Sequence, residues 1–315
     1  MTERSPANLP ASVHQLLLNK ARHTHRPFNE LLQYYAMERF LYRLSKSPHA
    51  ARFILKGALM FTAWKLESYR PTMDIDLLGR TANRVESVVA IAREVCAQTA
   101  APDGIVFNPA TVKGARIIED ANYPGVRIRF QANLGAARVT LQLDIGFGDV
   151  IVPAPLLIEY PTLLDFEAPR LRGYSNESMV AEKFESLVTL GILNSRMKDY
   201  FDIWTLSQQF DFDGETLGNA IAKTFSNRGT KIVPEPVGLT AKFADDSTKK
   251  SQWRGFIRKS RLDASPDLGE ILFGIASFLG PLATALRAGR SFQGKWTAPG
   301  PWIGLRPAGR QLQSA

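Results

Sequence analysis

The sequence predicts an α+β protein in which a region of mixed helices and strands is followed by a helical region. Three consecutive segments alternate apolar and polar residues, "VKGARIIED", "GVRIRFQANL" and "ARVTLQLDIGFGD", and the turn signals "YPG" and "LGA" separate them. Such alternation is typical of half-buried strands. The segments before and after them carry apolar residues at helical spacing. An apolar fraction of 45% in 315 residues supports a sizeable core.

The first half of the chain begins with helices and continues with strands. Residues 11–47 predict two helices, because apolar residues recur at helical spacing from 31 to 44 and Asn29 is placed to cap the second helix. We then expect a short helix through "GALMFTAWKLES", a strand in "TMDIDLLG" and a helix from Val85 to Thr99. After the three alternating segments, the prolines of residues 150–175 predict a loop with extended pieces.

The second half is predicted to be mostly helical. "NESMVAEKFESLVTLG" indicates a helix that Ser175 or Asn176 could cap and Gly191 could end, and another helix begins near Ser195. Residues 271–286 are uncharged, but they fall short of the ~20 residues that span a bilayer, and Pro281 interrupts them. We therefore expect a buried helix there, kinked or split, and an irregular tail from residue 289.

The cysteine content and the first residues favour the cytoplasm. Cys96 is the one cysteine of the chain, so a disulfide framework is excluded and a reducing compartment is indicated. The start, "MTERSPANLPASVHQ", lacks the apolar stretch of an export signal. We expect a cytoplasmic protein with no membrane partner.

A net charge of +9 and a pI of about 9.7 indicate polyanions or nucleotides as partners, although a merely basic protein has the same charge. One stretch, "KKSQWRGFIRKSR", is a candidate RNA-binding surface because basic residues surround Trp253 and Phe256. A solvated helix face with core aromatics is the alternative. The basic residues of this stretch are Lys249, Lys250, Arg254, Arg258, Lys259 and Arg261.

Two carboxylates one residue apart, Asp74 and Asp76, interrupt the apolar strand "MDIDLL". Because side chains alternate along a strand, both acids project from one face while Ile75 and Leu77 enter the other. Two close carboxylates repel each other, so a cation is expected beside them. A pair of Mg²⁺ ions fits, since Mg²⁺ prefers hard oxygen ligands and keeps positions open for phosphate oxygens. A solvated strand end with two incidental acids is the alternative.

A third acid, Asp144, lies on the strand "RVTLQLDIGF" among core residues. From an adjacent strand it could complete a two-metal clamp and take the proton from an attacking hydroxyl. Upstream, Gly57 and Ala58 stand where a turn and a helix start could offer backbone N–H groups to a triphosphate, although glycine there could serve only as a turn.

Lys183 falls inside the apolar stripe of the helix after Asn176, between Met179 and Leu187. Its ammonium could reach solvent along the core surface, or it could meet an anion such as a nucleotide phosphate.

The segment "NSRMKDYFDIW" places Asp199 and Asp202 on one helical face near Arg196 and Lys198. Local ion pairing is one interpretation of this segment. The alternative is that Asp199 orients Arg196 or Lys198 toward a substrate phosphate.

The motifs "LKGALMF", "RPTMDID", "LQLDI", "VAEKFESLV" and "NSRMKDYFDIW" occur in an order that resembles the nucleotidyl transferase AbiEii/AbiGii toxin family. The resemblance covers most of residues 10–210. It implies a DNA polymerase β-like nucleotidyltransferase core, a mixed sheet with flanking helices, in residues 51–172. Residues 1–50 would be helices packed on this core, 173–288 a helical C-terminal domain and 289–315 the irregular tail.

The resemblance also implies a site and an activity. Asp74, Asp76 and Asp144 would bind Mg²⁺, Lys183 would hold the nucleotide and Asp199 would belong to the last motif. The family implies transfer of NMP from an NTP to an acceptor hydroxyl, at the 3′ end of tRNA or another RNA, by the toxin of a bacterial toxin–antitoxin or phage-defence pair. A winged-helix antitoxin is the expected partner. One departure is Gly57-Ala58 where related proteins commonly have Gly-Ser.

Transfer to a protein or small molecule is the alternative reaction. A catalytically idle protein that keeps the fold and binds an antitoxin is the alternative of another class.

Overall fold

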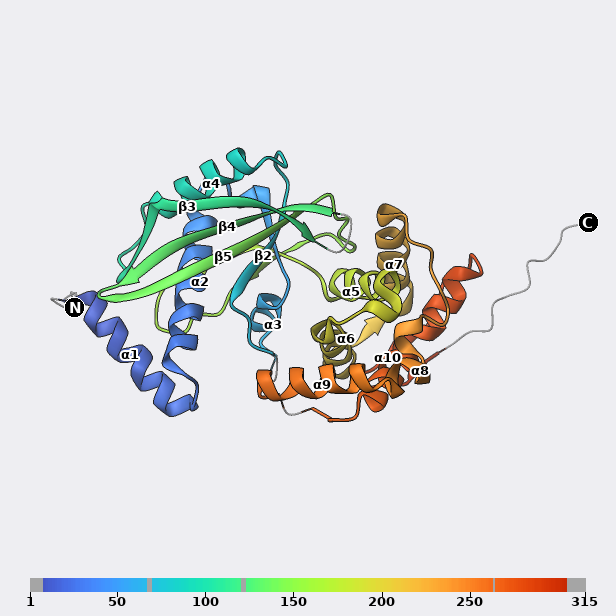
Figure 1. The fold of residues 1–315 in the computed structure, drawn as a ribbon. Helices are drawn as coiled ribbons and strands as arrows, with labels where there is room; N and C mark the ends of the chain where they lie inside the picture. Colours follow the sequence, from blue (N-terminus) through green and yellow to red (C-terminus); the bar gives the residue numbers. More distant parts are fainter. Residues whose placement is uncertain (1–7, 67–69, 120–122, 263, 305–315) are drawn as a thin grey trace, which may run out of the picture. The chain divides into compact units, whose positions relative to one another are not determined.

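The computed structural model describes residues 8–66, 70–119, 123–262 and 264–304 (Figure 1). The chain divides into two compact units. The first comprises Met1–Lys65, Pro71–Gly148 and Leu156–Gly173, and the second comprises Leu66–Arg70, Asp149–Pro155 and Tyr174–Ala315.

A mixed sheet forms the centre of the first unit. In the described residues it has seven strands in the order β3-β4-β5-β2-β1-β7-β6. Strand β2 runs parallel to β5 and β1 runs parallel to β7, whereas the other neighbours are antiparallel. The predicted mixed sheet with flanking helices is thereby confirmed. The strands are β1 Phe53–Lys56, β2 Asp74–Gly79, β3 Ile105–Glu119, β4 Tyr123–Leu134, β5 Ala137–Phe147, β6 Leu156–Glu159 and β7 Arg170–Gly173.

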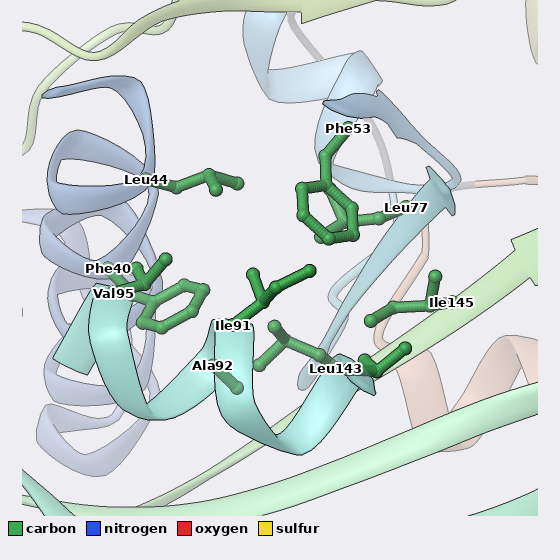
Figure 2. A pocket seen from close by; sticks show the side chains of 10 residues that line it. Phe40, Leu44, Phe53, Leu77, Ile91, Ala92, Val95, Leu143 and Ile145 are labelled. Carbon is green, nitrogen blue, oxygen red and sulfur yellow. The ribbon is translucent and has the colours of Figure 1, made fainter. Parts of the chain in front are cut away.

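Two helices cover one face of this sheet. Helix α2 contacts β5 and α4, and helix α4 contacts β3 and β4. Figure 2 shows apolar side chains of both helices and of the strands converging around a small pocket in this core, among them Phe40, Leu44, Ile91, Leu77 and Leu143. The opposite face carries the carboxylates. The helices of the unit are α1 Leu9–Thr24, α2 Phe28–Lys46, α3 Leu59–Ala63 and α4 Val85–Ala97, with the 3-10 turn η1 Ala50–Arg52.

Helix α2 is buried at every position from 31 to 44, including its charged residues. Arg43 therefore pairs with Asp103 through two hydrogen bonds of 2.7 and 3.0 Å. Glu38 lies 2.8 Å from the Arg39 guanidinium and accepts a hydrogen bond from the Leu163 backbone N–H at 2.6 Å. Buried charges persist where such partners offset the loss of hydration.

Three sequence expectations need correction in this unit. Asn29 lies inside the first turn of α2, because Pro27 with φ −58° takes the N-cap position. The helix expected through residues 57–68 is shorter, because α3 has only five residues. Residues 67 and 68 of the expected helix lie outside the described residues. Residues 53–56 form the central strand β1, which the sequence did not predict because a four-residue buried run has no alternation.

The second unit is mainly helical, as predicted. Its first helix α5 begins after Ser175, whose hydroxyl accepts a hydrogen bond from the Ser178 backbone N–H at 3.2 Å, and it ends before Gly191. The helices are α5 Asn176–Leu190, α6 Met197–Gln209, α7 Gly214–Arg228, α8 Ala241–Asp245, α9 Ser247–Ser260 and α10 Leu268–Arg287, with the 3-10 turns η2 Gly191–Leu193 and η3 Val237–Leu239.

Helix α10 is one continuous helix with Pro281 inside it, so of the two expected forms the split helix is wrong and the kink stays a prediction. Among the described residues it is the one helix long and apolar enough, by length and composition, to cross a membrane. One side of it packs inside the second unit, where Ile271, Ile275, Phe278 and Leu282 are buried.

The region after α10 is more ordered than composition suggested. Strands β9 Lys295–Trp296 and β10 Trp302–Ile303 form a small sheet with β8 Phe212–Asp213. The Trp296 and Trp302 rings lie 4.9 and 5.8 Å from the ring of Phe278, and their indole N–H groups donate to backbone carbonyls. Aromatic burial therefore orders this stretch up to residue 304, whereas residues 305–315 of the expected tail lie outside the described residues.

Candidate functional site

Asp74, Asp76 and Asp144 share one face of the sheet in the first unit. Strand β2 buries Ile75 and Leu77 on the helix-covered face, so its two acids point to the other side. The register of β2 with β5 pairs Asp76 with Asp144 and Asp74 with Gln142. Side chains of paired residues lie on the same face, so the three acids stand on one face of the sheet, and their joint binding of a metal stays a prediction.

Asp144 is held by an arginine from the next strand. Arg127 donates from Nε and Nη2 to the two oxygens of Asp144, both at 2.7 Å. Gln142 adds a 3.2 Å hydrogen bond from Nε2 to Oδ2. The Asp144 side chain is only 9% exposed, so this fork is the main neutralising contact of a nearly buried charge.

Charges form a regular row across four strands. Lys56 of β1 pairs in register with Asp76, Asp76 with Asp144, and Asp144 with Arg127 of β4. The row therefore places a cation on each side of two neighbouring carboxylates. This arrangement offsets the repulsion between Asp76 and Asp144 on neighbouring strands.

A second row runs parallel to the first, two residues along each strand. Asp74 is in register with Gln142, Gln142 with Arg129, and Arg129 with Lys113 of β3. Arg129 donates from Nε to the Gln142 side chain at 2.9 Å, and both Arg129 and Lys113 are exposed. The face is thus acidic over β2 and basic over β3 and β4.

The donor set fits Mg²⁺ in chemistry, since carboxylate oxygens are its preferred ligands. Asp74 and Asp76 fit this role by position, since both project from β2 on the face opposite the helices. A metal ion at Asp144 would share the carboxylate with Arg127 or displace the guanidinium, because Arg127 and Gln142 already donate to its two oxygens. Within the described ranges, no group of three or more His, Cys, Asp or Glu side chains is arranged to hold a metal ion.

Gly57 forms the turn between β1 and α3 against Asp76. Its φ is +68°, and a Cβ atom built on it would lie 2.0 Å from Asp76 Oδ2. Glycine is required there both by backbone conformation and by this close approach. Ala58 follows at the start of α3, which has only five residues, so binding of phosphate by Gly57 and Ala58 remains a prediction.

Lys183 meets two aspartates in the second unit. Its Nζ lies 2.7 Å from Asp199 Oδ1 and 2.8 Å from Asp202 Oδ2. Of the two alternatives for this ammonium, solvent or an anion, the structure shows an anion. That anion is a pair of aspartates of the protein itself. An ammonium has three donors, so one N–H remains beyond these two contacts.

Two arginines complete this cluster. Arg196 donates from Nε to Asp199 at 2.6 Å, and Arg70 donates to both oxygens of Asp202 at 2.8 and 3.0 Å. Sequence reasoning missed Arg70, although it opens the stretch "RPTMDIDLLG" from which only the acids were taken. Lys198 is exposed.

The charged groups of the Lys183 cluster shift one another's pKa values. Burial alone would raise the pKa of Asp199, but Lys183 and Arg196 outweigh it and hold that pKa far below its usual range. Burial likewise opposes ionisation of Asp202, and Arg70 and Lys183 lower its pKa. Burial would lower the pKa of Lys183, but Asp199 and Asp202 raise it. All three groups are therefore charged at neutral pH.

The basic stretch on α9 is largely structural. Trp253 is fully buried and donates from its indole to the Ser265 carbonyl at 3.0 Å. Lys249 is buried and donates to the Asn194 carbonyl at 2.8 Å, while Lys250 pairs with Asp245 at 2.9 Å. This stretch is therefore better described as a solvated helix face above a core aromatic residue than as a surface on which RNA bases stack on Trp253. The basic residues that stay exposed are Arg254, Arg258, Lys259 and Arg261.

A family model described as nucleotidyl transferase AbiEii toxin, type IV TA system, matches residues 39–274, well over half of the chain. The chain belongs to the AbiEii nucleotidyl transferase toxin family. The matched residues include the carboxylate face and the Lys183 cluster. This AbiEii family consists of nucleotidyl transferase toxins of type IV toxin–antitoxin systems. Membership therefore implies an antitoxin partner.

Solved structures similar to this AbiEii-family chain include two from Helicobacter pylori. The structure of JHP933 is 15% identical to this chain with a TM-score of 0.42, and the match covers 82% of this chain and 97% of that one. The other structure, described as that of a candidate nucleotidyltransferase, is 16% identical with a TM-score of 0.40, and the match covers 82% of this chain and 95% of that one. The comparison with curated proteins finds no match.

Proposed function

We propose that the protein transfers a nucleoside monophosphate from an NTP to an acceptor hydroxyl, at the 3′ end of tRNA or another RNA, in a Mg²⁺-dependent reaction. The observation that carries the proposal is the register that places Asp74, Asp76 and Asp144 on one sheet face in a chain of this family. Carboxylates that share one face supply the hard oxygen ligands that divalent-cation phosphoryl chemistry uses.

Each proposed role follows from position. Asp74 and Asp76 would hold Mg²⁺ against the triphosphate, and Asp144 would take the proton of the attacking hydroxyl once it is released from Arg127. When bound, Mg²⁺ supplies charge neutralisation at the reacting phosphorus. The acceptor oxygen forms the new P–O bond at the α-phosphorus, and pyrophosphate leaves with the electrons of the broken P–O bond. No nucleophilic side chain is needed.

The backbone N–H groups of Gly57 and Ala58 are proposed to contact the triphosphate. Lys183 of the second unit is proposed, separately, to bind the nucleotide through its remaining N–H. Asp199 would orient Lys183 and Arg196, as its 2.7 and 2.6 Å contacts indicate. Lys198, exposed one residue before Asp199, is the proposed mobile cation for phosphate.

An RNA acceptor is supported by the sheet face beside the carboxylates. Lys113, Arg129 and Arg138 lie exposed on β3, β4 and β5 and share this face with Arg127. From Arg138 to Asp144 the strand extends roughly 20 Å, enough for several nucleotides of a strand whose 3′ end reaches the carboxylates. A basic surface of this kind binds phosphates without reading sequence.

The proposed setting is the cytoplasm, in a toxin–antitoxin or phage-defence pair with a winged-helix antitoxin. Family membership supports the toxin role, and the net charge of +9 supports a polyanionic acceptor.

The test incubates the protein with each α-labelled NTP, Mg²⁺ and either total RNA or RNA-free lysate. We expect label on RNA that is removed by a 3′ exonuclease, and none with Asp76→Asn. Label on protein or on small molecules would replace the RNA acceptor with another one. No label from any NTP would favour an idle antitoxin-binding protein.

A further inference from the structure

We infer that Arg127 is a built-in counter-ion that competes with divalent metal for Asp144 and thereby sets the metal affinity of the carboxylate face. The inference rests on the proposed function, because it takes Asp74, Asp76 and Asp144 as the metal ligands. It assigns a role to an arginine that sequence reasoning did not single out.

The geometry of the pair sets Arg127 against a metal ion at the same carboxylate. Arg127 occupies both oxygens of Asp144 at 2.7 Å, the bidentate arrangement in which arginine binds carboxylates most strongly. A metal ion bound to Asp144 needs at least one of these oxygens. A guanidinium cannot lose its proton in proteins, so the site can be opened by movement of Arg127 but not by its deprotonation.

The charge balance points the same way. The row Lys56, Asp76, Asp144 and Arg127 carries two positive and two negative charges in register. Arg127 therefore pairs with Asp144 before any ion arrives, and Lys56 stands in register with Asp76. The electrostatic binding free energy of a divalent cation in this row is therefore smaller than beside three uncompensated carboxylates. The cation must also displace or approach a fixed positive charge.

Arg127 has room to leave. Its side chain is 34% exposed, whereas that of Asp144 is 9% exposed. A partly exposed guanidinium can turn to solvent or to a phosphate oxygen, which it binds with the same fork geometry as a carboxylate. Movement of the arginine, rather than of the acid, therefore opens the third ligand position.

The experiment measures Mn²⁺ binding by calorimetry, without nucleotide, to the full chain and two variants. We expect Arg127→Gln to bind Mn²⁺ about tenfold more tightly than the unchanged protein, a difference of about 1.4 kcal/mol. Arg129→Gln is the matched control, since it removes the same charge from the same strand face but its partner is Gln142. Its affinity should change less than about twofold, because only general charge is altered.

Adding Asp144→Asn to Arg127→Gln should abolish the gain. Equal gains in Arg127→Gln and Arg129→Gln would overturn the inference, since net charge would explain both. Mn²⁺ binding to the unchanged protein as tight as to Arg127→Gln would overturn it while leaving the proposed function intact. Absence of Mn²⁺ binding in every variant would overturn both.

Loss of the arginine could also unfold the chain, because Asp144 would keep a nearly buried charge. Arg127→Lys retains the charge but not the fork, so it should fold and show an intermediate affinity. The rise in Tm caused by Mn²⁺ gives a second readout that needs only small amounts of folded protein. A larger rise for Arg127→Gln than for Arg129→Gln is expected, and an equal rise counts against the inference.

Discussion

At the scale of single residues, Gly57 connects backbone conformation to the candidate site. Its positive φ and the 2.0 Å approach of Asp76 Oδ2 to the position of a Cβ atom leave no space for a side chain. Any other residue at this position must move either the turn or Asp76. The placement of one metal-ligand candidate thus depends on the absence of a methyl group.

Gly57→Ala should lose about 1–2 kcal/mol of unfolding free energy from backbone strain alone and should also shift Asp76. The control is Gly148→Ala, because Gly148 has φ +84° but no atom within 4 Å of a built Cβ. Chemical denaturation and Mn²⁺ binding measure the two effects. We expect both variants to lose stability and only Gly57→Ala to lose Mn²⁺ affinity; equal affinities would contradict the contact with Asp76.

Glu38 is a second residue whose environment has a measurable consequence. Burial raises the pKa of Glu38 to about 7, against the opposing effects of Arg39 and the Leu163 N–H. The folded state therefore keeps a proton on this carboxyl between about pH 4.5 and 7, where the unfolded chain has lost it. Stability must then fall as pH rises through this window.

Glu38→Gln should remove this dependence, because glutamine does not titrate. Relative to the variant, the unchanged protein should lose about 3 kcal/mol of unfolding free energy between pH 4.5 and 7, following 1.36 kcal/mol for each pKa unit. Denaturant titrations at several pH values provide the measurement. Parallel curves for the two proteins would show that Glu38 has an ordinary pKa.

At the scale of elements, helices α5 and α6 are joined by charges as well as by packing. Lys183 of α5 contacts Asp199 and Asp202 of α6, and Arg70 adds a bidentate contact from outside both helices. Breaking one partner of such a buried network costs more than the network contributes overall, because charges remain without compensation.

Lys183→Met should therefore destabilise the second unit by about 3–5 kcal/mol. Lys198→Gln, at an exposed position of the same segment, should change stability by less than about 0.5 kcal/mol. Denaturation followed by tryptophan fluorescence checks both values. A small loss in Lys183→Met combined with loss of nucleotide binding would assign the lysine to substrate rather than to the fold.

The proposed RNA acceptor has two candidate binding surfaces, the face of β3, β4 and β5 and the exposed side of α9. The first lies beside the carboxylates, and the second has its aromatic residues turned into the core. The structure therefore favours the sheet.

Replacing Lys113, Arg129 and Arg138 by glutamine should weaken RNA binding and reduce the slope of log affinity against log salt by roughly 2, at about 0.7 per lost phosphate contact. The matched control removes equal charge from α9 through Arg254→Gln, Arg258→Gln and Lys259→Gln. Fluorescence anisotropy across a salt series separates the surfaces. A larger change in the α9 variant would move the acceptor to that helix.

At the scale of the whole molecule, membership of a toxin family leads to the prediction that the protein inhibits growth. Expression in bacteria without an antitoxin should inhibit growth, and Asp76→Asn should relieve the inhibition because it removes a proposed metal ligand. Asp165→Asn is the control, an exposed acid of the same unit, and should leave inhibition unchanged. Colony counts after induction, with equal protein levels shown by blotting, decide the result. Inhibition that persists in Asp76→Asn would indicate toxicity by binding alone.

The sequence by itself determined the mixed α/β and then helical organisation, since alternation along β4 and β5 and the 3.6-residue period of α4 and α5 are local properties. It also determined that Asp74, Asp76 and Asp144 oppose the apolar face of their strands. Lys183 was identified as unusual because an ammonium stood in an apolar stripe.

Only the tertiary structure decided which charges meet. Arg127 joins Asp144 through the register of β4 with β5, and Arg70 joins Asp202 across 132 positions of chain. Strand β1 and the ordered strands β9 and β10 likewise depend on distant partners rather than on their own pattern. The physical reason is that periodicity records which side of an element is buried, whereas ion pairs and strand neighbours depend on register and long-range packing, which a local pattern does not contain.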